Sequence, residues 1–320
     1  MARPISAPTR TLAGIGAAGA GAIFYGTVIE RNAFVLRHFD VPVLTPGSAA
    51  MRVLHVSDLH ITARQRRKQD WIRGLAELQP DLVINTGDTL SALDAIPAVM
   101  HALEPLFAFP GAFVPGNNDY WAPRPKNPAR YFQRPGGELP DDLVPLPWPT
   151  LARAMAGAGW EDLTHVRTTV TVNADNASRA SRAAGAARAA GAVRVALAGT
   201  DDPHLGRARY VKIAGAADPD ADVRIGVIHS PEPRLLAAFA ADGYDLLLAG
   251  HTHGGQVRIP FGPPLVTNCG IDRARARWLH QWDGDGMYFH ICAGLGTNPY
   301  SPIRFCCRPE ATLLTLTPRP

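Results

Sequence analysis

The chain has 320 residues, of which 46% are hydrophobic and 19% charged, and its formal net charge is +4 at pH 7. This composition is typical of a folded globular protein and excludes a disordered chain as the default. The 4 cysteines include no Cys-x-x-Cys spacing, so they indicate neither a zinc knuckle nor a disulfide framework. The arginines are scattered along the chain rather than gathered in one stripe, which argues against specific nucleic-acid binding.

The first predicted element is an uncharged run from Thr11 to Ile29, with arginines before and after it. As a helix this run would extend about 28 Å, close to the roughly 30 Å of a bilayer core. Because the run is rich in Gly and Ala, two alternatives stay open. It is a single N-terminal anchor in the cell membrane, or it is a helix packed on the domain of a cytoplasmic protein.

The proline-bearing segment that follows predicts a linker over residues 41–50. We therefore divide the chain into a hydrophobic segment with its linker, residues 1–50, and one folded domain, residues 51–320. Within that domain, residues 173–192 have low complexity and predict a flexible insert between two strands.

Strands and helices alternate through most of the predicted domain. Short apolar or alternating runs predict strands at 52–57, 81–85, 111–114, 168–172, 193–198, 223–228 and 245–249. Helical stretches are predicted at 68–78, 93–103, 151–158 and 232–241. Further strands at 265–268, 287–292 and 311–317 are assigned to a second sheet. This order favours two packed sheets with helices outside.

Five of the strands lead directly into a polar loop. In chain order these loops carry Asp58 and His60, then Asp88, Asn117, His229, and finally His251 with His253. Polar loops at the carboxyl ends of strands are where α/β proteins build their sites, so we expect these side chains to lie together. Oxygen and nitrogen ligands of this kind suit two divalent ions, such as Mn, Fe or Zn, with one carboxylate between them.

Each motif by itself also has an ordinary explanation. Asp-x-His is common in turns, and a glycine-rich turn with two histidines can simply lie at the surface. The order of all five loops is therefore what carries the prediction. Asp58-Leu59-His60, Gly87-Asp88, Gly116-Asn117-Asn118-Asp119, His229 and Gly250-His251-Thr252-His253 together resemble the signature of the calcineurin-like metallophosphoesterase superfamily, and the resemblance covers roughly residues 52–316. Gly254-Gly255-Gln256, directly after the last pair of histidines, resembles the same stretch in the bacterial membrane-linked branch of this superfamily, which is phosphodiesterase-like.

The resemblance implies an α/β fold, namely a four-layer αββα sandwich of two mixed sheets with a dinuclear metal site at the strand ends. It implies that Asp58, His60 and His253 bind the first ion, that Asp88 bridges, and that Asn117, His229 and His251 hold the second. It also implies that a metal-bridging hydroxide attacks phosphorus in line and so hydrolyses a phosphodiester or pyrophosphate bond. We expect Asp88, Asn118 and His251 to take part in catalysis. A membrane anchor would favour a lipid-linked substrate.

The chain departs from the family pattern at one position. The family usually has His after the metal-binding Asn, and here Asn118 occupies that place. An amide cannot deliver a proton to a leaving group, so either another residue such as His204 does so or the reaction favours good leaving groups. The competing hypothesis is a metal-bound scaffold or binding module of the same fold with little catalytic activity.

Overall fold

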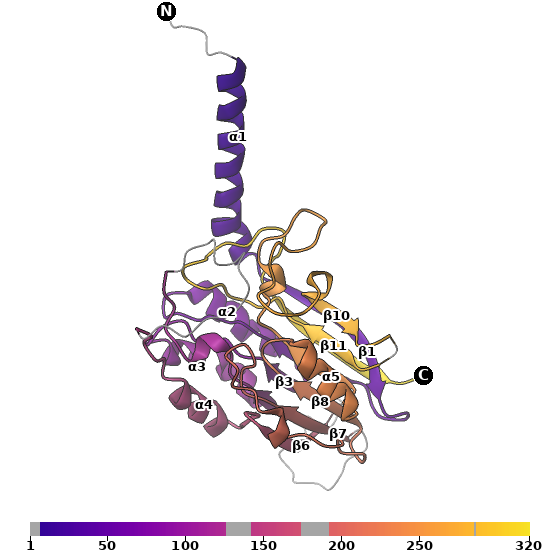
Figure 1. Cartoon of the computed structure of the whole chain (residues 1–320). Coiled ribbons are helices and arrows are strands. Elements are labelled where there is room, and N and C mark those ends of the chain that lie inside the picture. Colours follow the sequence, from indigo (N-terminus) through magenta and orange to yellow (C-terminus); the bar gives the residue numbers. More distant parts are fainter. Residues whose placement is uncertain (1–6, 126–141, 174–191, 285) are drawn as a thin grey trace, which may run out of the picture.

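The computed structural model describes residues 7–125, 142–173, 192–284 and 286–320. Apart from its two end residues, the predicted insert at 173–192 lies outside this range. The described residues form two six-stranded sheets packed face to face, with a long N-terminal helix that projects from the body (Figure 1).

The first sheet has the strand order β1-β12-β2-β3-β4-β5. Its strands are β1 (Val35–Leu44), β12 (Glu310–Pro318), β2 (Met51–Val56), β3 (Leu82–Asn85), β4 (Gly111–Phe113) and β5 (Trp160–Asp162). Strands β2 to β5 run parallel, whereas β12 runs antiparallel to β2 and parallel to β1. The sheet is therefore mixed, as the family resemblance implies.

The second sheet has the order β10-β11-β9-β8-β7-β6. Its strands are β10 (Trp278–Gln281), β11 (Tyr288–Ile291), β9 (Leu246–Ala249), β8 (Val223–Val227), β7 (Ala192–Gly199) and β6 (Val166–Asn173). The four central strands are parallel and the two edge strands antiparallel to their neighbours. This sheet is mixed as well.

Helices cover the outer faces of both sheets, which gives four layers. Helices α2 (Arg66–Gly74), α3 (Ile96–Leu103) and α4 (Trp148–Gly157) share a buried apolar cluster with the first sheet, and α5 (Pro233–Ala241) shares one with the second. A third cluster lies between the sheets and contains Val53, Ile84, Val195 and Ile225. Because both faces of the central strands are covered, these strands read as continuous apolar runs in the sequence.

Part of the expected linker is a strand of the first sheet. Strand β1 pairs with β12 along its length, and Val41, Val43 and Leu44 are buried between the sheets. Pro42 is tolerated because β1 is an edge strand, where one row of backbone N–H groups needs no partner. The body of the domain thus begins at β1, upstream of residue 51.

Two of the later strand predictions also need correction. Residues 311–317 do form a strand, but β12 belongs to the first sheet, where it lies between β1 and β2. Residues 265–268 form an irregular loop rather than a strand. Residues 287–292 are largely β11 and lie in the second sheet as predicted. The sheet that a strand joins depends on partners distant in sequence, which local patterns do not specify.

Helix α1 (Ala7–Phe24) continues into a π-helical turn, Tyr25–Ile29, and a 3₁₀ turn, Glu30–Asn32. Figure 1 shows α1 standing away from both sheets. Within the described ranges, no helix combines the length and the apolar character needed to cross a bilayer. This finding does not support the predicted transmembrane anchor, and the projecting helix does not match the packed alternative.

Deletion of residues 1–44 should strongly destabilise the domain, because it removes β1 and its buried side chains. Each buried aliphatic side chain contributes about 1.5–3 kcal/mol, so a loss of several kcal/mol is expected. Deletion of residues 1–24, which removes only α1, is the matched control and should leave the midpoint of thermal unfolding nearly unchanged. Equal unfolding midpoints for the two deletions would contradict the role assigned to β1.

Candidate metal centre

The predicted ligands gather where the carboxyl ends of strands from both sheets meet. Asp58 and His60 follow β2, Asp88 follows β3 and Asn117 follows β4, whereas His229 follows β8 and His251 and His253 follow β9. Loops from the two sheets are joined by backbone hydrogen bonds, including Leu295 N to Ser57 O and Gly296 N to Asp58 O, which link the loop after β11 to the loop after β2. The packing of two sheets, rather than one sheet edge alone, brings the side chains together.

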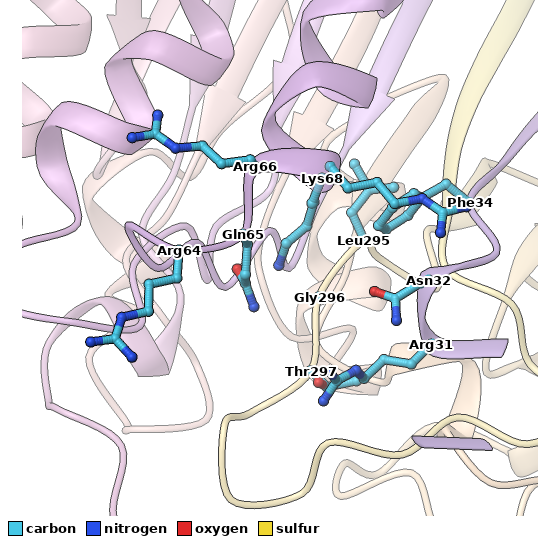
Figure 2. Close-up of a pocket in the computed structure, with 11 residues that line it drawn as sticks. Arg31, Asn32, Phe34, Arg64, Gln65, Arg66, Lys68, Leu295, Gly296 and Thr297 are labelled. Carbon is cyan, nitrogen blue, oxygen red and sulfur yellow. The ribbon is translucent and has the colours of Figure 1, made fainter. Parts of the chain in front are cut away.

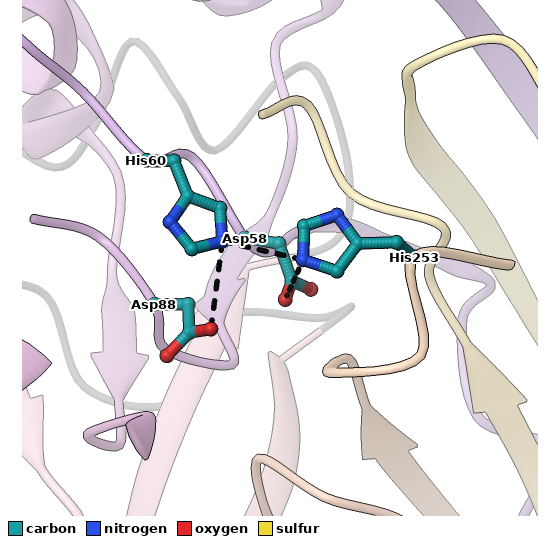
Figure 3. A group of neighbouring side chains, drawn as sticks. All are labelled: Asp58, His60, Asp88 and His253. Carbon is teal, nitrogen blue, oxygen red and sulfur yellow. Dashed lines mark hydrogen bonds and ion pairs between the residues drawn. The ribbon is translucent and has the colours of Figure 1, made fainter. Parts of the chain in front are cut away.

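Four of the residues form a compact set that could hold a metal ion: Asp58, His60, Asp88 and His253 (Figure 3). One ligand atom from each lies within 4.8 Å of the others. The Nε2 atoms of His60 and His253 are 3.2 Å apart, and each faces a carboxylate, Asp88 Oδ2 at 3.5 Å and Asp58 Oδ1 at 3.3 Å. Ligands around one tetrahedral ion, each about 2.0–2.2 Å from it, are separated by roughly 3–4 Å, so only a small contraction is needed.

The other three predicted ligands lie on the far side of Asp88. His229 Nε2 is 3.3 Å from Asp88 Oδ1, and the rings of His229 and His251 meet edge to face at 5.1 Å. Nδ1 of His251 is 3.0 Å from Asn117 Oδ1. The two oxygens of Asp88 therefore face different groups of residues.

Hydrogen bonds to the backbone and to serine orient three of the imidazoles. Nδ1 of His229 lies 2.7 Å from Thr86 O, and Nδ1 of His253 lies 3.2 Å from Gly296 O. Nδ1 of His60 lies 3.0 Å from Ser91 Oγ. A ring that donates from Nδ1 keeps the Nε2 lone pair free, so each ring can offer Nε2 to a metal.

Two buried polar atoms of the cluster, Asp58 Oδ1 and His229 Nε2, make no hydrogen bond, although each lies 3.3 Å from another potential ligand, His253 Nε2 and Asp88 Oδ1 respectively. Buried polar atoms normally make hydrogen bonds, so these two need an explanation. A carboxylate oxygen and an imidazole nitrogen are both ligands for Mn, Fe or Zn. The residues present therefore fit a divalent ion.

The pKa values of the cluster indicate the same need for positive charge. Burial raises the pKa of Asp58 to about 6, with the Asp88 carboxylate adding to the effect. Burial alone would lower the pKa of His229, but Asp88 and the other nearby carboxylates outweigh it and raise that pKa to about 10. In contrast, burial lowers the pKa of His60 to about 4. A cation bound between the carboxylates would supply the charge that the His229 proton otherwise provides.

Five of the seven predicted ligands have a left-handed backbone. The φ angles are 48° for Asp58, 42° for His60, 54° for Asp88, 67° for His251 and 50° for His253. This conformation costs roughly 1–2 kcal/mol for a residue other than glycine. Such strain gathers at functional sites, where the surrounding structure holds it in place.

Glycines allow the loops to approach the carboxylates closely. A Cβ atom on Gly116 would lie 2.2 Å from Asp88 Oδ1, and one on Gly250 would lie 1.9 Å from Ser57 Oγ. Ser57 Oγ in turn donates to Asp58 Oδ2 at 2.6 Å. Glycine immediately before Asn117 and immediately before His251 is thus a steric requirement of the cluster.

Asn118 and Asp119 have distinct positions. Both the backbone N–H and the Nδ2 group of Asn118 donate to Asp88, each at 2.7 Å. Asp119 does not reach the ligand cluster. Its carboxylate accepts hydrogen bonds from the backbone N–H groups of Thr89, Leu90 and Gly116 and so braces the two loops.

Two supporting residues were missed by the sequence analysis. Arg304 is fully buried, and its guanidinium donates to the carbonyls of Ala293, Gly294 and Gly296 beside His253. Lys68 is buried under the ligand loop and donates to the carbonyls of Leu59 and His60. Lys68 continues the apolar helical stripe of α2, a signal that could have placed it, whereas nothing in the local sequence marks Arg304.

The comparison with protein families agrees with this geometry. Residues 51–255 match the family model of the calcineurin-like phosphoesterases. The chain belongs to this family. The matched region contains all five ligand loops, and the loop that carries Arg304 lies beyond it.

Curated relatives match a smaller part of the chain. An uncharacterized metallophosphoesterase, YkuE of Bacillus subtilis, is 31% identical over 125 residues, which cover 38% of this chain and 41% of that protein. Phosphodiesterase YaeI of Escherichia coli is 31% identical over 120 residues, covering 38% of this chain and 40% of that protein. The matches thus span about two fifths of the length of these relatives. Among solved structures, TT1561 of Thermus thermophilus covers 77% of this chain and 90% of its own, with 8% identity and a TM-score of 0.38.

Asp88→Asn should lower metal content more than any other single change in the cluster, because this carboxylate faces both groups of ligands. Even residues that only support metal ligands contribute about 10–100-fold to affinity, so a loss of at least that size is expected. The measurement is metal bound per chain after dialysis against Mn. Asp245→Asn is the control, since it changes a buried carboxylate that precedes β9 and pairs with Arg224, at the opposite end of the strand from the ligand loop. Wild-type metal content in Asp88→Asn would contradict this assignment.

Arg304→Ala should destabilise the domain by about 3 kcal/mol or more, because several buried carbonyls lose their donor together. It should also weaken metal binding, since Gly296 O and His253 lose their shared neighbour. Urea unfolding with and without Mn measures both effects. Arg234→Ala, which removes an exposed arginine of α5, should change neither by more than about 0.5 kcal/mol.

Proposed function

We propose that the chain hydrolyses a phosphodiester or pyrophosphate bond in a metal-dependent reaction. The observation that carries the proposal is the buried cluster in which Asp88 stands between two groups of ligand atoms. Membership of the calcineurin-like phosphoesterase family supports phosphoester hydrolysis in general. A preference for diesters over monoesters does not follow from family membership, and we propose it in addition.

Divalent ions held by this cluster would lower the pKa of water and neutralise the negative charge of a phosphoryl group. In the proposed assignment, Asp58, His60 and His253 hold one ion, Asn117, His229 and His251 hold a second, and Asp88 contacts both. The protein positions these groups before substrate arrives, because Thr86 and Gly296 fix ring orientation and Asp119 braces the loops. Such preorganisation is the main contribution of a protein to phosphoryl transfer.

Hydrolysis forms a bond from water oxygen to phosphorus and breaks the bond to the ester oxygen, which then needs a proton unless it is a weak base. Asn118 carries no titratable proton and donates its Nδ2 group to Asp88. It can therefore orient Asp88 or a phosphoryl oxygen but cannot act as a general acid. This supports substrates whose leaving group departs as an anion, and the name of the relative YaeI, a phosphodiesterase, points the same way.

The test is a comparison of bis(p-nitrophenyl) phosphate with p-nitrophenyl phosphate, each with the Mn-loaded full chain. Faster turnover of the diester, lost in Asp88→Asn, is the expected result. A screen of nucleotide and lipid-headgroup diesters would then narrow the substrate. Failure to cleave any diester or pyrophosphate would refute the proposal.

A scaffold without turnover is the competing function, and the absence of a titratable side chain at position 118 favours it. The same preparation separates the two. The scaffold would be supported if the wild-type chain binds metal but hydrolyses no ester, and if Asp88→Asn leaves this lack of hydrolysis unchanged.

The rate on a series of aryl and alkyl diesters should depend steeply on the pKa of the leaving group. Loss of a general acid typically costs about 10²–10⁴ in rate, and the cost falls as the leaving group becomes a weaker base. Asn118→His should flatten this dependence. His204→Ala serves as the comparison, because the His204 ring lies 4.5 Å from that of His251 and is the alternative acid. Equal slopes in wild type and Asn118→His would exclude position 118 from proton transfer.

A further inference from the structure

A basic pocket lies where α1 joins the body, next to the start of α2 (Figure 2). It has a volume of about 310 Å³, and its lining includes Arg31, Arg64, Arg66, Arg67 and Lys68. No carboxylate of the described residues lines it. The pocket therefore presents a concentrated positive charge.

The charge of this pocket is available to a ligand. Arg64, Arg66 and Arg67 are exposed, and no ion pair joins them to a carboxylate anywhere in the described part of the chain. Asp70, the nearest acid on α2, does not line the pocket. In contrast, half-buried arginines elsewhere in the molecule, such as Arg73 and Arg194, pair with Glu104 and Asp218.

Exposed apolar side chains lie directly beside the pocket. Ile23 and Phe24 end α1 and are 61% and 59% exposed, and Val28 and Ile29 are 50% and 49% exposed. Ile29 is followed after one residue by Arg31 of the pocket lining. The exposed apolar residues and the basic pocket therefore both lie at the base of α1.

A turn from the second half of the chain adds to this surface. Val257 forms a β-bridge with Phe305, whose ring packs edge-on against Tyr25 at 6.2 Å. The turn that follows carries Ile259 and Phe261, and Phe261 is fully exposed with a left-handed φ of 60°. An exposed aromatic side chain held in this conformation contributes nothing to the core, which indicates a role in contact with a partner.

We propose that this surface docks on a lipid bilayer that contains anionic headgroups. Phosphate groups bind Arg64, Arg66, Arg67 and the pocket beside them, and Phe261 enters the boundary between headgroups and acyl chains with the exposed end of α1. Basic side chains next to apolar and aromatic ones are the composition of interfacial anchors. A two-fold dimer through the same surface would instead bring like charges together.

Docking would place the bilayer close to the ligand cluster. Lys68 and Gly296 line the pocket, and both contact the loop that carries Asp58 and His60. The surface and the cluster therefore share one loop. The inference itself does not depend on the proposed hydrolysis, because it concerns binding alone.

Flotation of the full chain with vesicles tests the charge component. Binding to vesicles of phosphatidylcholine with phosphatidylglycerol should exceed binding to phosphatidylcholine alone and should weaken with salt. The double variant Arg64→Ser/Arg66→Ser should weaken it about 25-fold, because each basic residue near an anionic leaflet contributes about 1 kcal/mol, or about fivefold. Arg153→Ser/Arg234→Ser removes two exposed arginines from α4 and α5 and is the matched control, expected to bind like wild type.

A tryptophan probe tests the apolar component. Phe261→Trp should gain fluorescence that brominated phosphatidylglycerol quenches, whereas Val211→Trp, at another exposed position, should not. Phe261→Ser should weaken vesicle binding about tenfold without changing turnover of a soluble diester.

Three results would overturn the proposal. They are equal binding to neutral and anionic vesicles, equal binding by the two double variants, and absence of quenching at position 261. If Phe261→Ser converted a dimer into a monomer with unchanged flotation, the surface would belong to a second copy of the chain instead.

Discussion

The buried carboxylate of Asp88 is the constraint on which the ligand cluster depends. It follows β3 of the first sheet, yet it contacts His229 from the second sheet, His60 from the neighbouring loop and Asn118 from the loop after β4. A second buried carboxylate, Asp58, lies nearby, and its pKa is raised by burial and further by the Asp88 carboxylate. Two negative groups in one buried site require positive charge nearby, and the site meets that requirement with a histidine whose pKa is about 10 or with a bound cation.

The backbone around this carboxylate is held in conformations that the free chain would avoid. Most of the predicted ligand residues have a left-handed backbone conformation, and glycines are required where the loops meet. The two packed sheets supply the stabilisation that offsets this strain, since the strands leading into the loops are buried on both faces. Asp119 and Arg304 then fix the loops through backbone N–H groups and carbonyls. Rigidity at the cluster is thus a property of the whole sandwich.

The proposed bilayer surface and the ligand cluster are coupled by their geometry. Lys68 is buried between them and reaches the carbonyls of Leu59 and His60 from the pocket side. The chain enters the domain at this same point, because the turn after α1 lines the pocket through Arg31 and Asn32. A phosphoesterase held at this surface would encounter headgroup phosphates at high local concentration. The proposed docking would also account for the exposure of Phe261 and of Ile23 and Phe24 at the end of α1.

The sequence by itself determined the order and chemical type of the predicted ligands and most of the alternating strands and helices. Buried strands appear as apolar runs and their loops as polar motifs, so both are local signals that need no partner to be read. The tertiary structure alone decided that β1 is a strand rather than a linker, because its partner β12 lies at the other end of the chain. It also decided the left-handed backbone of Asp58 and His60 and the place of Arg304 behind His253. These features arise from contacts between segments distant in sequence, and no local pattern of residue types encodes such contacts.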